Sequence, residues 1–229
     1  MSTAAKGGTL EQKFYLGVLL ILFPIILARY TLSLYIDSKN QYIQTVDALM
    51  KSVEARDQYT EGHSHRVGEI ALKIAKELKY NDFKMEQLRI ASILHDVGKI
   101  GVLDSILHKP TSLTEEEFNI IKQHPQKGHD ILNQIKNLDN IKPIVLHHHE
   151  RYDGKGYPRG IKGENIPIEG RCLGIVDAFD AMITDRPYRK GLSIEAAIQE
   201  LIRCSGTQFD PKLTEIFIKL YREGEISVA

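Results

Sequence analysis

The sequence predicts an all-α protein, and three of its features point to this fold class. Apolar residues recur at the three- and four-residue spacing of helices along most of the chain. Strand patterns, in which apolar and polar residues alternate, are sparse throughout. With 229 residues, of which 42% are hydrophobic and 26% charged, the chain can bury one good-sized core. We therefore expect one helical domain with a further helical segment at its N-terminus.

The N-terminal part divides into a tail, residues 1–12, and an apolar segment, residues 13–36, that predicts a transmembrane helix. From Phe14 to Ile36 the only charged residue is Arg29, whose long side chain can reach the headgroup region. A helix of about 20 apolar residues spans a bilayer, so the length fits. A buried or dimer-interface helix is the alternative. A cleaved signal peptide is disfavoured because no small-residue cleavage site follows the run.

Residues 37–56 predict an amphipathic connector helix. Its apolar residues could pair with a second copy, which favours a homodimer, and they are Tyr42, Val46, Leu49, Met50 and Val53. The basic residues around the apolar segment lean to a cytoplasmic C-terminal side. We therefore expect a single-pass protein of the cell membrane whose C-terminal domain is cytoplasmic. The same pattern would fit a fragment of a multi-pass sensor.

Helical patterns dominate the third part, residues 57–229. The expected helices are Ser64 to Leu78, Lys84 to His95, Thr114 to Gln123, Gly128 to Ile135, Ile141 to His149, Arg171 to Ala181, Ile194 to Cys204, and Pro211 to Tyr221. Thr114 with Glu117 forms a capping-box pattern. Arg151 to Glu169 is irregular and rich in glycine and proline, and such loops in helical enzymes usually carry function.

Charge and cysteine content exclude some partners and sites. The formal net charge is zero, from 30 basic and 30 acidic residues, so no overall field attracts a nucleic-acid polymer and we expect none as partner. Any anionic ligand must be held by a local site. Cys172 and Cys204 lie in helical segments without metal-binding or redox spacing, which indicates reduced thiols in a cytosolic setting.

Histidines are concentrated in one part of the chain. Seven of the nine lie between His95 and His149. His95 and Asp96 are adjacent at the predicted end of an apolar helix, where both side chains can turn toward one cation. A carboxylate can bridge two metal ions, which an imidazole cannot do. Histidines gathered near acidic residues in this way predict a metal site.

Two further motifs identify a family resemblance. The run from His148 to Pro158 reads H-H-E-R-Y-D-G-K-G-Y-P, and the later runs R-P-Y-R and G-T-Q-F-D-P begin at Arg186 and Gly206. Together with the His-Asp pair, these motifs resemble the HD-GYP family of the HD phosphohydrolases. The resemblance implies an HD-type helical bundle that hydrolyses cyclic di-GMP to linear pGpG and onward to GMP.

The resemblance also implies a set of metal ligands. They are His63, His95, Asp96, His124, His148, His149 and Asp177, with Asp96 as the bridge. Family members thought to hold three metals carry a glutamate where this chain has Tyr59, so we expect two divalent ions rather than three. Imidazole and carboxylate together suit iron or manganese, and the resemblance favours iron.

Catalytic and substrate-binding roles follow from residue chemistry near these motifs. Lys99 can donate to a non-bridging phosphoryl oxygen or to the hydroxide, and Asp180 is either a proton acceptor or a group that orients a ligand. The expected substrate-binding residues are Arg186, Arg189, Lys190 and Tyr157, where the arginines could grip guanine or phosphate and the tyrosine could stack on a base. A surface lysine, a solvated basic patch and a tyrosine that fills its own loop are the alternatives.

Three functions are compatible with these residues. The first is an active cyclic di-GMP phosphodiesterase, in which the GYP loop, residues 154–158, could also bind partner proteins. The second is a receptor or interaction module that binds a cyclic dinucleotide without turnover. The third is an HD hydrolase that acts on another nucleotide. Because the ligand set and the GYP motif are complete in sequence, the first is favoured.

Overall fold

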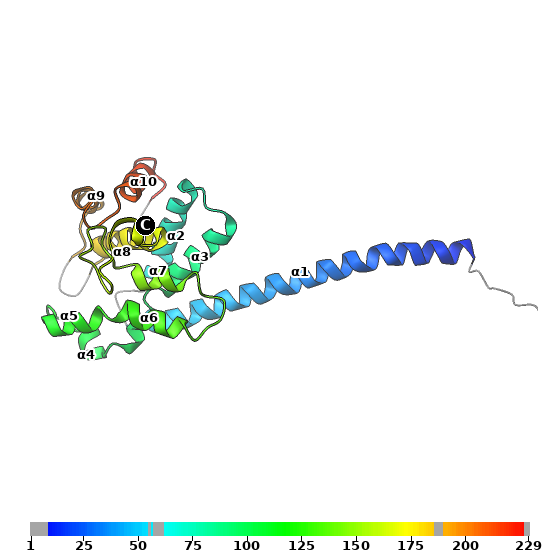
Figure 1. Ribbon diagram of the computed structural model, residues 1–229, viewed down its shortest axis with the longest axis horizontal. Helices are drawn as coiled ribbons and strands as arrows, with labels where there is room; N and C mark the ends of the chain where they lie inside the picture. The colour runs from blue at the N-terminus through cyan, green and yellow to red at the C-terminus, as the bar shows by residue number, and fades with distance from the viewer. Residues whose placement is uncertain (1–8, 55, 57–61, 186–189, 227–229) are drawn as a thin grey trace, which may run out of the picture. The chain divides into compact units, whose positions relative to one another are not determined.

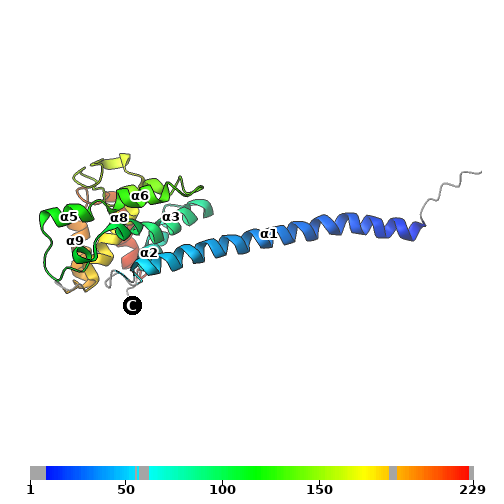
Figure 2. The same ribbon diagram turned by 90° about the horizontal axis from the view of Figure 1, so that it is seen from below.

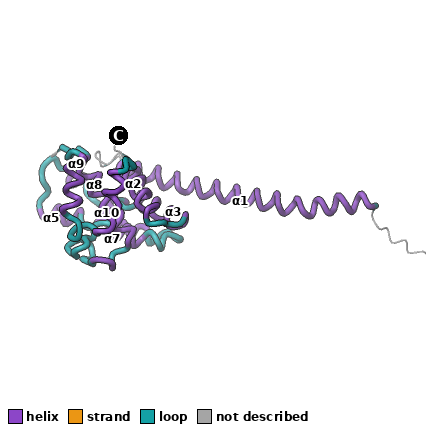
Figure 3. Tube along the Cα trace, turned by 90° about the horizontal axis from the view of Figure 1, so that it is seen from above, coloured by secondary structure: helices purple, strands orange, loops and turns teal. Residues whose placement is uncertain are grey.

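The computed structural model describes residues 9–54, 56, 62–185 and 190–226. Helices dominate this part of the chain, and its only β pairing is an isolated bridge between Ser205 and Phe209 (Figure 3). The predicted all-α class is therefore confirmed.

The first helix, α1, runs from Leu10 to Glu54 and contains the apolar segment. By length and composition, it is the one helix in the described part of the chain that could cross a membrane. By its contacts the chain forms two units, residues 1–45 and residues 46–229. In the first unit the apolar side chains of the segment are exposed.

The last turns of α1 belong to the second unit. Met50 is buried in its core at 3% exposure, and Val46 and Val53 pack against the same core. These three residues were expected to form part of a face for a second copy of the chain. In the structure they contact the core of their own domain, and pairing with a second copy stays a prediction.

The second unit is a bundle of short helices (Figure 1). After α1 the elements are α2 (His63–Glu77), α3 (Asp82–Leu94), η1 (Val97–Gly101), α4 (Asp104–Leu107), α5 (Glu115–Ile121), α6 (His124–Leu132), α7 (Lys142–His147), η2 (Gly163–Asn165), α8 (Ile168–Ile183), α9 (Ile194–Arg203) and α10 (Pro211–Arg222). Helix α8 lies among the others in both views (Figures 1 and 2) and packs against α2, α7, α9 and α10. Its Phe179 is fully buried and contacts Phe217 of α10.

Local sequence explains where the helices begin. The capping box of Thr114 and Glu117 is present at the start of α5. Asn81, Ser193 and Asp210 each accept a backbone N–H in the first turn of α3, α9 and α10.

Several helix boundaries differ from the sequence-based expectation, and two of the differences concern histidines. Helix α6 begins at His124 rather than Gly128, because Pro125 is tolerated in a first turn. Helix α7 ends at His147 rather than His149, with His148 as its C-cap. Both changes place histidines at helix ends.

Candidate metal centre

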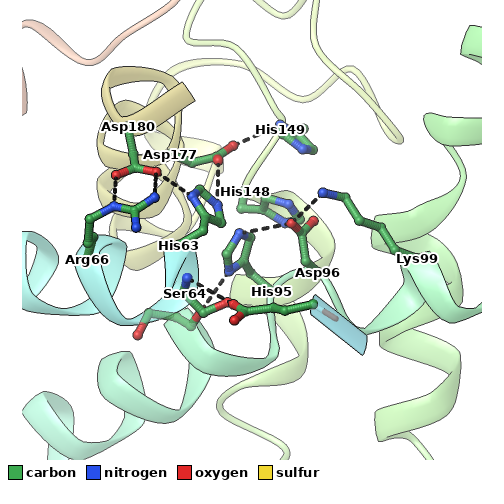
Figure 4. Close-up of polar contacts among 12 residues, drawn as sticks. His63, Ser64, Arg66, His95, Asp96, Lys99, His148, His149, Asp177 and Asp180 are labelled. Carbon is green, nitrogen blue, oxygen red and sulfur yellow. Dashed lines mark hydrogen bonds and ion pairs between the residues drawn. The ribbon is translucent and has the colours of Figure 1, made fainter. Parts of the chain in front are cut away.

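The structure brings together all seven residues that the family resemblance implied as ligands (Figure 4 labels six of them). They fall into two groups, within each of which the donor atoms lie within 4.8 Å of one another. The first group is Asp96, His124, His148 and His149, and the second is His63, His95 and Asp177. Each group has the size and chemistry to hold one divalent ion.

Most of these residues sit at helix ends. His63 is the first residue of α2, and His124 is the first of α6. His95 caps the end of α3 and His148 caps the end of α7. At a helix end the backbone changes direction, so neighbours such as His95 and Asp96 can face one site. Asp177 alone projects from the middle of a helix, α8.

Two glycines let the backbones approach closely enough for this convergence. A Cβ atom on Gly98 would lie 1.9 Å from the carbonyl oxygen of His124, so only glycine fits where η1 meets α6. A Cβ atom on Gly174 would lie 2.6 Å from the carbonyl oxygen of His148, where α7 meets α8. Each contact holds a ligand-bearing helix end against its neighbour.

Backbone carbonyls fix the orientation of three imidazole rings. The Nδ1 atoms of His95, His124 and His148 lie 2.6, 2.8 and 2.7 Å from the carbonyl oxygens three residues earlier. If each Nδ1 carries the proton and donates it, the Nε2 lone pair faces the site. The Nε2 atom of His95 is buried without a hydrogen-bond partner in the described structure. A buried nitrogen of this kind fits a metal ligand.

Burial keeps several of these imidazoles neutral. It lowers the pKa of His95, and it lowers the pKa of His148 well below the usual value. Burial, with His124 as a neighbour, lowers the pKa of His149 to about 3. Neutral imidazole is the form that binds metal, so these three residues need no deprotonation to act as ligands at neutral pH.

Two carboxylates lie between the two groups. Asp96 places Oδ1 3.2 Å from Nε2 of His124 and Oδ2 3.5 Å from Nε2 of His95. Asp177 places Oδ1 3.2 Å from Nε2 of His63 and Oδ2 3.8 Å from Nδ1 of His149 (Figure 4). Each carboxylate therefore faces one histidine of each group. Sequence reasoning singled out Asp96 as a bridge but missed that Asp177 has the same placement.

Asp180 holds His63 and does not line the cavity. Its Oδ2 atom lies 2.6 Å from Nδ1 of His63, and Arg66 donates to both of its oxygens at 2.7 and 2.9 Å (Figure 4). Burial alone would lower the pKa of His63, but hydrogen bonds to Asp177 and Asp180 raise it to about 10. This geometry favours the orienting role expected for Asp180 over that of a proton acceptor. Arg66 carried no sequence signal and was missed.

A cavity of about 320 Å³ is lined by all four residues of the first group and by Asp177 of the second. Its lining includes Asp96, Lys99 and Asp177, so the expected donor Lys99 shares the space with the candidate ligands. Small residues of α8, among them Gly174 and Ala178, form part of its wall and leave room beside Asp177. The cavity can therefore admit a phosphate ester beside the first group and the carboxylate of Asp177.

Comparison with known proteins settles the family. A profile of the HD domain matches residues 47–213. The chain belongs to the HD domain family. The family resemblance predicted from the histidine and glycine motifs is thereby confirmed, and the matched range ends in α10.

Curated relatives of this HD protein are phosphodiesterases by name. A cyclic di-GMP phosphodiesterase of Thermotoga maritima is 41% identical over 182 residues, which cover 79% of this chain and 50% of that protein. A cyclic di-GMP phosphodiesterase response regulator of Xanthomonas campestris is 37% identical, with 77% and 47% covered. A 3'3'-cGAMP-specific phosphodiesterase of Vibrio cholerae is 36% identical, with 84% and 37% covered. The chain spans half or less of the length of these relatives.

Solved structures show that the HD-type helical fold was correctly predicted. A cyclic GMP-AMP-specific phosphodiesterase of Vibrio cholerae superposes with a TM-score of 0.59 at 21% identity, over 79% of this chain and 49% of that one. The HD domain of the Listeria monocytogenes phosphodiesterase PgpH, in complex with cyclic di-AMP, gives 0.55 at 17% identity, over 78% and 97%. At these identities the likeness concerns the fold.

The residues expected to bind substrate differ in where they lie relative to the cavity of this HD domain. Tyr157 lines the cavity, and its ring packs on that of His149 with centroids 4.9 Å apart. Lys190 is exposed and is not among the residues that line the cavity. Arg186 and Arg189 lie outside the described residues, as does Tyr59. Their roles stay predictions.

The GYP loop is fixed by hydrogen bonds that sequence reasoning did not find. The Oε1 atom of Glu150 accepts the backbone N–H groups of Arg159 and Gly160 at 2.6 and 3.1 Å. Arg151 binds Asp153 and donates to Oε1 of Gln208 at 2.9 Å. These contacts hold the loop against the segment before α10, and the ring of Tyr157 lies beside His149 of the first ligand group. Arg151 and Gln208 also line the cavity.

Proposed function

We propose that this chain is a metal-dependent phosphodiesterase that hydrolyses cyclic di-GMP to linear pGpG and then to GMP. The observation that carries the proposal is a pair of adjacent ligand groups beside a cavity that Lys99, the first group and Asp177 line. The names of the relatives from Thermotoga maritima and Xanthomonas campestris support the substrate. The complete set of ligand side chains argues against a receptor without turnover.

Two divalent ions fit the site, one for each group. His63, His95 and Asp177 would hold one ion, and Asp96 with the other three histidines would hold the second. The mixed nitrogen and oxygen donors suit iron or manganese, and iron is favoured. When bound, such ions draw electron density from a phosphoryl group and make a nearby water molecule more acidic.

The side chains of the protein supply the remaining chemistry. Lys99 donates to a non-bridging phosphoryl oxygen as negative charge develops there. Asp180, itself held by Arg66, fixes the ring of His63 so that Nε2 faces the site. Tyr157 closes one wall of the cavity, and Arg186, Arg189 and Lys190 bind the phosphate or the guanine edges of the substrate.

A second candidate substrate follows from one relative. The Vibrio cholerae relative is named as specific for 3'3'-cGAMP, which differs from cyclic di-GMP in one base. Because both substrates present the same phosphodiester to the metal centre, the ligand groups do not separate them. The residues around the bases would decide between them.

The proposal includes the location of the enzyme and its protein contacts. Helix α1 would anchor the chain in the cell membrane as a single span, with the HD domain in the cytoplasm. The part of α1 before Val46 would carry any pairing with a second copy. The GYP loop would be the surface for protein partners.

Turnover by metal-loaded protein tests the function. The full chain, purified in detergent without oxygen and loaded with Fe²⁺ or Mn²⁺, is expected to convert cyclic di-GMP to pGpG and GMP, whereas Asp96→Asn is not. Product analysis with 3'3'-cGAMP and cyclic di-AMP in parallel identifies the preferred substrate. A wild-type chain that binds its metal and the dinucleotide yet leaves all three intact would establish the receptor function instead.

A further inference from the structure

Helix α2 begins without a cap of its own. Its N-cap residue is Gly62, which adopts a left-handed conformation (φ 69°) and has no side chain to accept a hydrogen bond. The first turn of α2 also contains no acidic residue. The backbone N–H groups of a first helical turn have no partner within the helix and carry partial positive charge. The turn that carries His63 therefore depends on groups from elsewhere in the fold.

Helix α1 supplies these groups. Glu54, buried at 8% exposure, accepts the backbone N–H of Ser64 through Oε1 at 3.1 Å. Asp47 lies earlier in the same helix, and its Oδ1 atom is 2.7 Å from Nε2 of His65. Both carboxylates come from the end of α1, and both contact the first turn of α2. Glu54 thus acts as a cap provided by a different helix.

The position of Glu54 is set by packing. Met50 lies one helical turn before Glu54, on the same face of α1, and is buried in the core of the domain. Arg56, just beyond the helix, donates to the carbonyl oxygen of Ile100 at 3.2 Å and binds the carboxylate of Asp104 at 2.7 Å. The end of α1 is therefore fastened both to α2 and to the segment that follows Lys99.

His63 connects the first turn of α2 to the second ligand group. It is the residue immediately before Ser64, and its Nε2 atom lies 3.2 Å from Oδ1 of Asp177 within the second ligand group. A change in the first turn of α2 would therefore move a donor atom of that group. The other group, which contains no residue of α2, would keep its geometry.

We propose that Glu54 is a positioning residue for His63, and that the end of α1 sets how tightly the group of His63, His95 and Asp177 holds its metal ion. The inference rests on the proposed role of these three residues as ligands. Through this contact the proposed membrane helix would control the enzyme. A displacement of α1 would change the occupancy of one ion and leave the other ion bound.

The test is a Mn²⁺ titration of the metal-free full chain in detergent, followed by calorimetry and by electron paramagnetic resonance. Loss of a residue that orients a ligand weakens metal binding by about 10–100-fold. We expect a shift of that size for one of two ions in Glu54→Ala. Glu54→Gln, whose amide oxygen still accepts the Ser64 N–H, should stay close to wild type. Ser52→Ala, an exposed change on the same helix, is the matched control.

Three results would overturn the inference or its basis. Wild-type affinity for both ions in folded Glu54→Ala would remove the positioning role. Equal weakening of both ions, with a lowered melting temperature, would show that Glu54 serves only the stability of the fold. A wild-type chain that binds no Mn²⁺ would overturn the ligand assignment itself, whatever the variants do. If Glu54→Ala fails to fold, Glu54→Asp is expected to show the same selective loss.

Discussion

Lys99 and Asp96 form an ion pair at the wall of the cavity, with Nζ of the lysine 2.7 Å from Oδ2 of the aspartate. Burial alone would raise the pKa of Asp96, but Lys99 and His95 outweigh it and hold that pKa well below its usual value. The lysine therefore keeps a buried carboxylate ionised. We propose that its ammonium group also donates to a phosphoryl oxygen of the substrate.

Lys99→Met should slow the chemical step of the reaction. Removing one donor to developing negative charge lowers kcat by about 100-fold or more in comparable sites. We expect such a fall for cyclic di-GMP at saturating metal, with a smaller change in KM. Steady-state kinetics check this, with the exposed Lys76→Met as control. Turnover by Lys99→Met within a factor of about two of wild type would contradict the proposed donor role.

Asp177→Asn should weaken the binding of both metal ions, because the carboxylate faces His63 of one group and His149 of the other. We expect both dissociation constants to rise by about tenfold or more. Elemental analysis after dialysis measures the metal that is retained. Asp139→Asn, at an aspartate that is 82% exposed, is the matched control. Loss of only one ion would show that Asp177 belongs to a single group.

Alanine substitutions at two glycines of α8 should differ in their effects on stability and metal binding. In Gly170→Ala the new Cβ atom lies 3.4 Å from the nearest carbonyl oxygen, and helix propensity favours alanine by about 1 kcal/mol, so stability should hold or rise. In Gly174→Ala it would lie 2.6 Å from the carbonyl oxygen of His148, so α7 must shift. Urea unfolding and Mn²⁺ titration compare the pair. Equal metal affinity in both variants would contradict the close-approach argument.

The GYP loop should lose stability in acid through Asp153. A hydrogen bond from Arg151 lowers the pKa of Asp153 from 3.8 to about 2. A lowered carboxyl pKa stabilises the folded state above the unfolded pKa, and this contribution is lost as the pH falls from 3.8 toward 2.

Urea unfolding of the metal-free chain at several pH values measures this contribution. The difference in unfolding free energy between wild type and Asp153→Asn should be constant above about pH 5 and shrink below about pH 4. A difference that does not depend on pH would show that the ion pair contributes nothing.

Sequence reasoning succeeded where the signal is local. Helical spacing and the capping box of Thr114 and Glu117 gave the helical elements, because propensity and first-turn hydrogen bonds depend on neighbours in the chain. It failed at the boundaries of α6 and α7, where His124 and His148 occupy helix ends. A boundary depends on which side chain is drawn into the core, which the local pattern does not contain.

By itself the sequence determined the helical class, the family and the residues that gather at the site. The tertiary structure alone decided how those residues divide into two groups, that Asp177 faces both of them, and that Glu54 caps the helix of His63. Contacts between helix ends far apart in the chain follow from packing. The backbone approaches at Gly98 and Gly174 bring such ends together, and their partners cannot be read from one linear sequence.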